Sequence, residues 1–268
     1  MTSDEGYPRS TSPVALRPLI YAHRGSTLLR PENTAFAFDW ALAVGAHVLE
    51  TDVRLSRDER VMVVHDERLD RTTEAQGPVR AHTAQALGRL DAGYRFRDPD
   101  GRDWRGDGAR IEPLDALFER YPTVRINIDI KDRDPRAAQR VAETIERADR
   151  GDDVTVGSFH TAVLERFRQL APTVATAAGK SEVVSLYFLR HRRRTALPYR
   201  FLQIPVRYAG LPLDTPAFID LARSHAIRSV YWTVNDEATM RRLIARQVDG
   251  IVTDRPDRLA EVLAAYLS

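Results

Sequence analysis

The segment LIYAHRGSTLLRPENTAFAFDWALAVGAHVLETDV, residues 19–53, predicts a strand, a helix and a second strand in succession. LIYAH (19–23) and HVLETDV (47–53) are short, mostly apolar runs of the kind that form buried strands. Between them, ENTAFAFDWALAVG has the apolar spacing of a helix that is capped by Asn33 and ends at Gly45. Two strands joined through a helix indicate a parallel β–α–β unit.

The same alternation continues along the chain. Further strand-like runs are RINIDIK (125–131), VTVGSF (154–159), VATAAG (174–179), FLQIPV (201–206), SVYWTV (229–234) and GIVTD (250–254). Helical spacing separates most of these runs, with capping residues at Asp134, Thr215 and Asp236. Eight strands alternating with helices are typical of an α/β fold of the (β/α)8 TIM-barrel type. An open doubly wound sheet is less favoured, because the first turn lacks a G-x-G-x-x-G segment.

Two segments do not fit the eightfold alternation. VMVVHD (61–66) follows the second strand too closely for a crossover helix, so we expect a hairpin return at the barrel rim. Residues 71–110 are rich in Gly, Asp and Arg, and we expect them to form a small insertion after the second strand. We therefore predict one TIM-barrel domain over residues 18–268, preceded by a disordered tail at 1–17.

Composition excludes several classes of protein. The 268 residues carry a net charge of only +2 and no cysteine, which excludes disulfides and thiolate metal sites. We expect a cytoplasmic protein without membrane insertion, because no run approaches the length of a membrane span and the N-terminus lacks an apolar signal region. The basic run RHRRRTALPYR (190–200) lacks interleaved aromatic residues, so we expect a solvated surface and no nucleic-acid partner. No pattern fixes the oligomeric state.

Polar residues recur where the predicted strands end, which is the face on which TIM barrels carry their chemistry. They are His23 and Arg24, Glu50 and Asp52, Asp129 and Lys131, Ser158, Trp232 to Asn235, Thr253 and Asp254, with His65 and Asp66 on the rim hairpin. We expect these side chains to converge at one mouth of the barrel.

Glu50 and Asp52 pose an electrostatic problem, because residues two apart on a strand share a face and two buried carboxylates repel each other. Together with Asp129 they would form a cluster of three carboxylates, and a divalent cation would remove the repulsion. Oxygen ligands alone favour one hard cation, Mg²⁺ or Ca²⁺, over Zn²⁺. The alternative is a structural network in which Glu50 and Asp52 pair with nearby arginines.

His23 and His65 lie at predicted mouth positions beside the carboxylates, where two imidazoles can serve as general base and general acid. The remaining histidines are expected to be structural. Arg24 offers a planar fork to phosphate oxygens, and Lys131, one of only two lysines, offers a compact charge. Lys131 could instead pack structurally against a carboxylate. A metal, two histidines and two cations together indicate phosphodiester chemistry.

The motifs resemble those of the glycerophosphodiester phosphodiesterases, in order and across nearly the whole chain. They are AHRG (22–25), RPENT (30–34), GAHVLETDV (45–53), DERVMVVHDERLDRTT (58–73), IEPLDALF (111–118), INIDIK (126–131), GSF (157–159), VYWTVN (230–235) and DGIVTDRP (249–256). The resemblance implies a TIM barrel that hydrolyses small glycerophosphodiesters, such as glycerophosphocholine or glycerophosphoethanolamine, to sn-glycerol 3-phosphate and an alcohol.

The resemblance also implies roles for individual residues. His23 and His65 correspond to the acid–base pair of the family, and Glu50 and Asp52 to its metal ligands. Arg24 and Lys131 correspond to its phosphate-binding residues, while Phe159 and Trp232 would wall the substrate pocket. The insertion corresponds to a small substrate-covering subdomain.

One departure concerns Asp129, which stands where the family often has a longer glutamate, so its direct contact with the metal is in question. The closest alternative function is a lysophospholipase D acting on lysolipids, with an acyl groove formed by Leu28, Leu29, Tyr94 and Phe96. A non-catalytic glycerol-phosphate-binding barrel is disfavoured, because it would require the loss of a histidine or a metal ligand.

Overall fold

The structure, a computed structural model, describes residues 17–188 and 197–267 and contains one barrel of parallel strands. Its strands are β1 (Leu19–His23), β2 (Val48–Leu55), β4 (Arg125–Ile130), β5 (Val154–Gly157), β6 (Ala175–Thr176), β7 (Phe201–Pro205), β10 (Arg228–Trp232) and β11 (Gly250–Thr253). They pair in the order β6-β5-β4-β2-β1-β11-β10-β7, and a parallel bridge from Ala177 to Phe201 joins the two ends. The barrel is therefore nearly closed.

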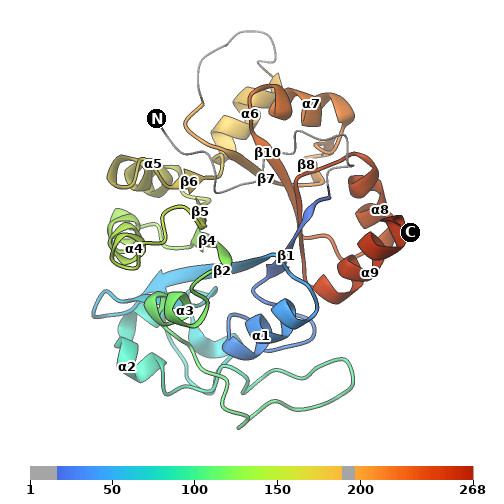
Figure 1. Cartoon of the computed structure of the whole chain (residues 1–268). Helices are drawn as coiled ribbons and strands as arrows, with labels where there is room; N and C mark the ends of the chain where they lie inside the picture. Colours follow the sequence, from blue (N-terminus) through green and yellow to red (C-terminus); the bar gives the residue numbers. More distant parts are fainter. Residues whose placement is uncertain (1–16, 189–196, 268) are drawn as a thin grey trace.

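A helix follows each barrel strand, and these helices form the outer ring in Figure 1. They are α1 (Ala35–Ala43), α3 (Leu114–Arg120), α4 (Pro135–Arg147), α5 (Thr161–Leu170), α6 (Lys180–Phe188), α7 (Pro216–Ser224), α8 (Glu237–Ala245) and α9 (Pro256–Leu267). The (β/α)8 barrel predicted from the alternation of strands and helices is confirmed.

Helix capping follows the sequence in three of four places. The side chains of Asp134, Thr215 and Asp236 each accept a hydrogen bond from a backbone N–H in the first turn of α4, α7 and α8. The cap predicted at Asn33 is wrong, because Thr34 caps α1 instead by accepting from the N–H of the third residue after it. The side chain of Asn33 is committed elsewhere, to Asp52 and its neighbour on β2.

The loop after β1 packs directly against α1 and requires glycine at one position. Gly25 has a φ of 84°, in the left-handed region. A Cβ built on Gly25 would lie 2.4 Å from the Cβ of Ala37 on α1, closer than two carbon atoms can approach. Glycine at this position therefore lets the loop bring Arg24 back toward the barrel mouth.

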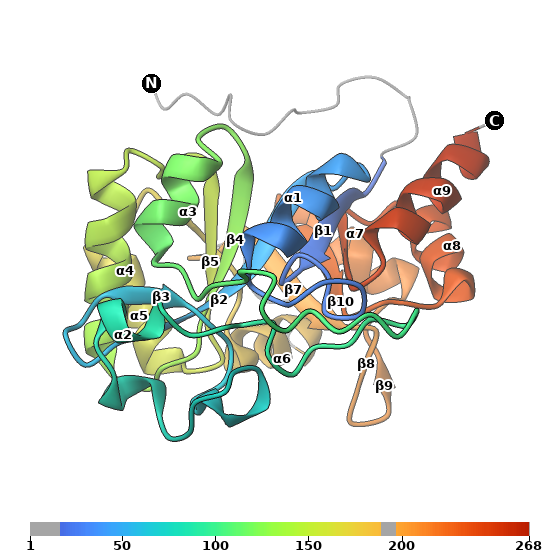
Figure 2. The ribbon, with the colours of Figure 1, turned by 90° about the horizontal axis from the view of Figure 1, so that it is seen from below.

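The rim hairpin is confirmed, since β3 (Val61–Val63) pairs antiparallel with the end of β2. The segment that follows contains two short 3₁₀ turns, η1 (Leu69–Arg71) and η2 (Val79–Ala81), and the single-turn helix α2 (Ala84–Leu87). A small apolar cluster of its own, including Met62, Leu69, Val79 and Leu87, holds it together. A second hairpin, β8 (Arg207–Tyr208) and β9 (Leu211–Pro212), extends from the same end of the barrel in Figure 2.

Buried side chains inside the barrel fill the space below the mouth. Tyr21, Val48, Phe201 and Val230 form one such cluster, and the ring of Tyr21 lies so near Gly250 that a Cβ there would sit 2.5 Å from it. This packing leaves the polar groups at the carboxyl ends of the strands.

Two expectations concern parts of the chain that the structure does not describe. The tail expected at 1–17 lies outside the described residues except for its last residue, and so does most of the basic run 190–200. Within residues 17–188 and 197–267, no helix combines the length and apolar character needed to cross a membrane.

Candidate active site

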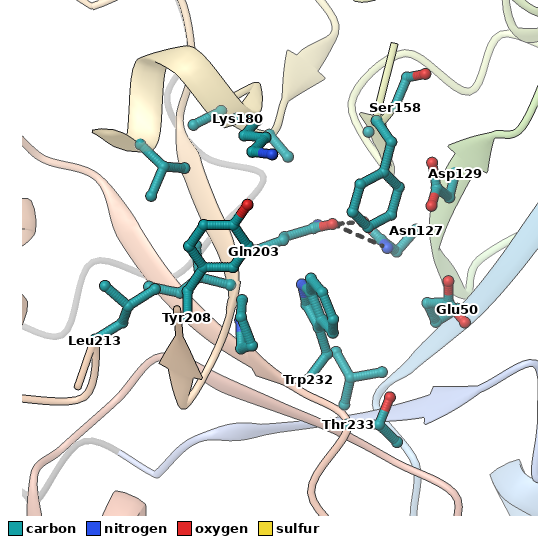
Figure 3. Close-up of a pocket in the computed structure, with 18 of the residues that line it drawn as sticks. Glu50, Asn127, Asp129, Ser158, Lys180, Gln203, Tyr208, Leu213, Trp232 and Thr233 are labelled. Carbon is teal, nitrogen blue, oxygen red and sulfur yellow. Dashed lines mark hydrogen bonds between the residues drawn. The ribbon is translucent and has the colours of Figure 1, made fainter. Parts of the chain in front are cut away.

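One cavity of about 570 Å³ occupies the mouth of the barrel (Figure 3). All of the predicted site residues line it, namely His23, Arg24, Glu50, Asp52, His65, Asp129, Lys131, Phe159 and Trp232. They come from β1, β2, the rim hairpin, β4, the end of β5 and β10. The convergence expected from the polar strand ends is therefore observed.

Strand register explains why the acidic residues meet. β2 lies between β1 and β4, so that Glu50 is level with His23 on one side and Asp52 with Asp129 on the other. Glu50 and Asp52 keep only 7% and 1% of their surfaces exposed. Both carboxylates are thus held at the mouth without access to bulk water.

Asp52 is stabilised as an anion by two cations. Its carboxylate lies 2.9 Å from Nε of Arg24 and 3.0 Å from Nζ of Lys131, and it accepts a hydrogen bond of 3.1 Å from Asn33. Burial acts to raise the pKa of Asp52, but Lys131 and Arg24 outweigh it and hold the pKa below its ordinary value. The pairing with a nearby arginine, which the sequence left as the alternative to a metal site, is therefore present at Asp52.

Glu50 lacks such compensation. Burial, together with the adjacent charge of Asp52, raises the pKa of Glu50 to about 7. Its carboxylate accepts a hydrogen bond of 3.0 Å from the backbone N–H of Arg24. The two acids that share a face of β2 therefore differ in pKa. Two cations compensate the charge of Asp52, whereas no cation forms a comparable ion pair with Glu50 in the described part of the chain.

Lys131 bridges two of the carboxylates. Its ammonium lies 2.7 Å from Oδ2 of Asp129 and 3.0 Å from Oδ1 of Asp52, and these charges raise the pKa of Lys131 although burial opposes them. The other carboxylate oxygen of Asp129 is buried and has no hydrogen-bond partner in the described part of the chain. Within that part, no three acidic or imidazole groups form a ready-made metal cluster.

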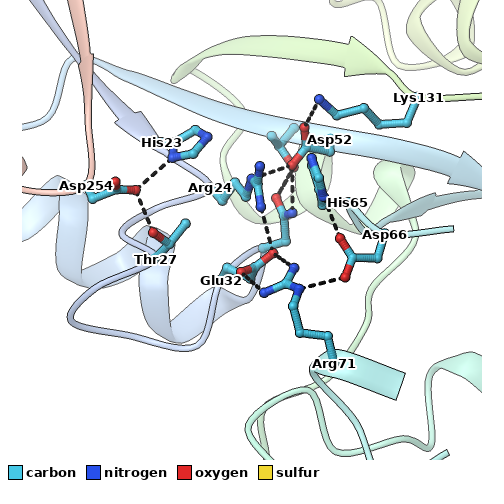
Figure 4. A network of polar contacts seen from close by, with 12 residues as sticks. His23, Arg24, Thr27, Glu32, Asp52, His65, Asp66, Arg71, Lys131 and Asp254 are labelled. Carbon is cyan, nitrogen blue, oxygen red and sulfur yellow. Dashed lines mark hydrogen bonds and ion pairs between the residues drawn. The ribbon is translucent and has the colours of Figure 1, made fainter. Parts of the chain in front are cut away.

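His23 is fixed by a carboxylate from the far end of the sequence. Its Nδ1 lies 2.7 Å from Asp254, which also accepts a hydrogen bond of 2.7 Å from Thr27 (Figure 4). Asp254 accepts a further hydrogen bond of 2.8 Å from Asn235. Burial acts to lower the pKa of His23, but the bond to Asp254 and the charge of Glu50 outweigh it, so the pKa is raised. This environment favours the protonated imidazole.

His65 has a similar contact but a different environment. Its Nδ1 lies 2.6 Å from Asp66, which is paired in turn with Arg71 at 2.6 Å. Arg71 also donates two hydrogen bonds of 2.7 Å to Glu32 (Figure 4). Burial lowers the pKa of His65, and the charges of Asp52 and Asp66 do not reverse this. This environment favours the neutral imidazole.

Several residues that hold the predicted site residues in place could not be given this role from the sequence. Asp254 was noted as a polar strand end, but nothing in the sequence joined it to His23, which lies 231 residues away. Arg71 falls at the start of the predicted insertion and inside the motif 58–73, but the sequence gave no role for it. Glu32 and Asn33 belong to the PENT motif, and the structure places Glu32 between Arg24 and Arg71.

Aromatic residues wall the mouth opposite the carboxylates. Phe159 and Trp232 meet edge to face, with ring centres 5.8 Å apart, and Nζ of Lys131 lies 5.4 Å from the centre of the Phe159 ring. Phe159 is 61% exposed, which is unusual for so large an apolar side chain unless it contacts a ligand or partner.

The acyl groove expected from Leu28, Leu29, Tyr94 and Phe96 is not brought to the cavity, since none of the four lines it. The apolar wall comes instead from α6 and the β8–β9 hairpin. Sequence reasoning missed this wall because β8 and β9 are only two residues long each and resemble an ordinary loop.

Comparison with known proteins shows the family to which the chain is similar. Residues 23–258 match the model of the glycerophosphoryl diester phosphodiesterase family. A glycerophosphodiester phosphodiesterase of Bacillus altitudinis is 33% identical over 252 residues, which cover 91% of this chain and 97% of that protein. A human lysophospholipase D is 26% identical over 271 residues, covering 90% of this chain and 85% of that protein. The crystal structure of a glycerophosphodiester phosphodiesterase from Agrobacterium tumefaciens strain C58 superposes with a TM-score of 0.74 at 29% identity, covering 91% and 99% of the two chains.

Proposed function

Because the chain belongs to the glycerophosphoryl diester phosphodiesterase family, we propose that it hydrolyses glycerophosphodiesters by acid–base catalysis between His23 and His65. The products would be sn-glycerol 3-phosphate and an alcohol such as choline or ethanolamine. One observation carries the proposal: both imidazoles line one cavity, and each is held through Nδ1 by its own carboxylate. Nε2 is therefore the ring nitrogen of each that is left to exchange a proton with substrate.

The different environments of the two histidines support one division of roles in this proposal. His65, with a lowered pKa, accepts the proton of the nucleophile as general base. His23, with a raised pKa, donates its proton to the leaving alkoxide as the phosphorus–oxygen bond breaks. The nucleophile is water or the glycerol 2-hydroxyl, and a cyclic phosphate among the early products would identify the second.

Arg24 and Lys131 supply fixed positive charge beside the reacting phosphate. Both line the cavity and both contact Asp52, so their charged groups are oriented before substrate arrives. Pre-oriented charge stabilises the phosphoryl oxygens in the transition state without the cost of reorganising solvent. In this proposal Asp52 positions the two cations as well as contributing a ligand.

The donor set also fits a hard divalent cation. The raised pKa of Glu50 and the unpartnered buried oxygen of Asp129 are both signs of missing positive charge. We assign Glu50, Asp52 and Asp129 as the residues that would hold Mg²⁺ or Ca²⁺, which both prefer oxygen ligands. When bound, such an ion would neutralise charge on the phosphate.

The test of activity is the release of glycerol 3-phosphate from glycerophosphocholine by purified protein, followed by ³¹P NMR. We expect turnover with Mg²⁺ or Ca²⁺, loss of turnover with a chelator, and recovery when the ion is restored. Mg²⁺ or Ca²⁺ should also raise the melting temperature of the wild type more than that of Glu50→Gln. Full activity in excess chelator would contradict the metal assignment and leave the histidine roles to be tested separately.

The relative named as a lysophospholipase D makes lysolipids the second substrate class to include in this assay. A panel that pairs each lysolipid with its deacylated analogue separates the two classes, because the reacting phosphate is the same in both.

A further inference from the structure

Two amide side chains meet inside the cavity. Asn127 on β4 and Gln203 on β7 each donate a hydrogen bond to the other, and the bond from Nδ2 of Asn127 measures 3.4 Å. β5 and β6 separate these two strands in the barrel, so the pair spans the interior. In Figure 3 the side chain of Gln203 lies between Tyr208 on one side and Glu50 and Asp129 on the other. The amide pair therefore occupies the middle of the cavity, between the carboxylates and the far wall.

This pairing uses only half of the hydrogen-bonding capacity of each amide. A primary amide has two N–H groups and two carbonyl lone pairs, and the reciprocal contact takes one of each. In the described part of the chain, no other hydrogen bond to either side-chain amide is present. Asn127 is 3% exposed, and both residues line the cavity. Each amide can therefore donate to, and accept from, a polar group that enters the cavity.

Small residues leave the amide of Gln203 open to that space. Gly157, the last residue of β5, lines the cavity together with Ala177. A Cβ built on Gly157 would lie 3.4 Å from Oε1 of Gln203 and 3.7 Å from the Cβ of Ala177. These are ordinary contact distances, so a methyl group at position 157 would fit and would cover the carbonyl of Gln203. Glycine there keeps the second lone pair accessible.

The chemistry of an amide favours a hydroxyl group as its partner. A hydroxyl both donates and accepts, so it can use the remaining N–H and the remaining lone pair. A quaternary ammonium group has neither a donor nor an acceptor, and it would leave the amide unsatisfied once water is displaced. Trp232 and Tyr208, which also line the cavity, offer apolar contact to either kind of headgroup. The amide pair is therefore the feature that distinguishes between them.

The order of the strands places the leaving alcohol near Gln203. In the proposed function His65 accepts the proton of the nucleophile and His23 protonates the leaving oxygen, and these two oxygens lie roughly in line through phosphorus. The alcohol would then extend past His23 and away from His65. Beyond β1, which ends at His23, the barrel continues through β11 and β10 to β7, the strand that carries Gln203.

Resting on the proposed function, we propose that Gln203 is a specificity-determining residue that binds a hydroxyl group of the leaving alcohol, with Asn127 as its positioning residue. Asn127 holds the amide of Gln203 before substrate arrives, which lowers the entropic cost of the contact. The favoured substrates are glycerophosphodiesters whose alcohol carries further hydroxyl groups, as a polyol does. The reaction is unchanged, and the polyol leaves with the proton that His23 donates.

The test compares esters of sn-glycerol 3-phosphate that differ only in the leaving alcohol, namely glycerol, 1-propanol and choline. The hydroxyl ratio is defined as kcat/KM for the glycerol ester divided by kcat/KM for the propyl ester. Differences in acidity between the alcohols affect the wild type and its variants alike. A change in the hydroxyl ratio on substitution therefore reports a contact with the leaving alcohol.

Three substitutions should lower the hydroxyl ratio. Gln203→Met removes both donor and acceptor at similar length, and the ratio should fall by about tenfold. Gly157→Ala covers the carbonyl and keeps the amide pair, so the ratio should fall by about fivefold. Asn127→Ala leaves Gln203 present but unheld, and the ratio should fall by about threefold. Gly157→Ala keeps the test available if the loss of either amide prevents folding.

Gln139→Met is the matched control. Gln139 bonds Glu143 on the exposed side of α4 and does not line the cavity, so its hydroxyl ratio should equal that of the wild type. Calorimetry in the His65→Ala background tests the contact without turnover. The glycerol ester should bind about fivefold more tightly than the propyl ester, and addition of Gln203→Met should remove this difference.

The outcomes separate this inference from the proposed function. Hydrolysis with the same hydroxyl ratio in the wild type, Gln203→Met and Gly157→Ala would overturn the inference and leave the proposed function standing. Equal losses on all three esters would do the same, because they would place the contact on the retained glycerol or make it structural. Tighter binding of the glycerol ester that depends on Gln203, without hydrolysis of any diester, would overturn the proposed function and support the hydroxyl contact.

Discussion

The two histidines at the mouth of the barrel, His23 and His65, are each held by an aspartate, and the two aspartates have different partners. In each, Nδ1 lies within hydrogen-bonding distance of an aspartate. Asp254 accepts hydrogen bonds from two neutral donors, Thr27 and Asn235, so its negative charge remains to act on His23. Asp66 instead forms an ion pair with Arg71, which offsets the negative charge of Asp66.

Burial acts to lower the pKa of both imidazoles; the bond to Asp254 and the charge of Glu50 outweigh it and raise the pKa of His23, whereas the pKa of His65 stays lowered, with Arg24 and Lys131 adding to the effect of burial. We expect Arg71 to add to this difference by offsetting the charge of Asp66.

The largest expected effect is loss of either imidazole, and the leaving group separates the two losses. With glycerophosphocholine, both His23→Ala and His65→Ala should lose about 10²–10⁴-fold in kcat. With a p-nitrophenyl ester of glycerol phosphate, His23→Ala should recover to within about tenfold of the wild type, because nitrophenolate leaves without a proton. His65→Ala should stay inactive on both substrates.

His225→Ala is the control for these variants, because His225 only ends α7 and does not line the cavity. It should retain wild-type kcat on both esters. Recovery of His65→Ala instead of His23→Ala on the nitrophenyl ester would reverse the assigned roles.

A smaller effect should follow from removing the charge of Asp254 or of Asp66. The two changes should have opposite effects on the pH range over which the protein is active. Activity should fall as pH rises through the pKa of His23, since the acid must be protonated, and as pH falls through the pKa of His65. Asp254→Asn lowers the pKa of His23 by about one unit and should narrow the profile from its alkaline side. Asp66→Asn lowers the pKa of His65 and should widen the profile on its acidic side.

These shifts are measured from kcat/KM against pH with glycerophosphocholine. Equal movement of the same limb in both variants would show that the two aspartates do not act on separate histidines.

The smallest effect should come from removing the charge of Arg71, which forms an ion pair with Asp66. Arg71→Gln leaves the charge of Asp66 uncompensated, so the pKa of His65 should rise and the acidic limb should move upward by about half a unit. Arg68→Gln is the matched control, because Arg68 lies three residues away and pairs with exposed Asp70 at 3.2 Å. An unchanged acidic limb in Arg71→Gln would remove Arg71 from the explanation of the difference between the histidines.

The barrel could be predicted from the sequence because its strands and helices are encoded locally. Each apolar run of strand type became a strand, and the return at Val61–Val63 followed from the short spacing after β2. The convergence of His23, Glu50 and Asp129 followed from one rule, that parallel strands in a barrel end on the same face.

Other features depend on competition between contacts, which sequence alone does not display. Asn33 is a good capping residue, but hydrogen bonds to Thr51 and Asp52 hold its side chain, and Thr34 caps the helix instead. An apolar wall was sought at Leu28 and Leu29 after β1 and at Tyr94 and Phe96 of the insertion. It lies instead on α6 and the β8–β9 hairpin, because exposed apolar residues in short elements carry no periodic pattern.

The pairing of β1 with β11 joins the first strand of the barrel to the last, and Asp254 follows β11 directly. A nascent polypeptide therefore has its imidazole at position 23 well before it gains the carboxylate that orients it, which follows 231 residues later. Ribosome-bound fragments that stop before residue 250 would lack both β11 and the carboxylate that holds His23, so the mouth of the barrel cannot be assembled until β11 and Asp254 have been made.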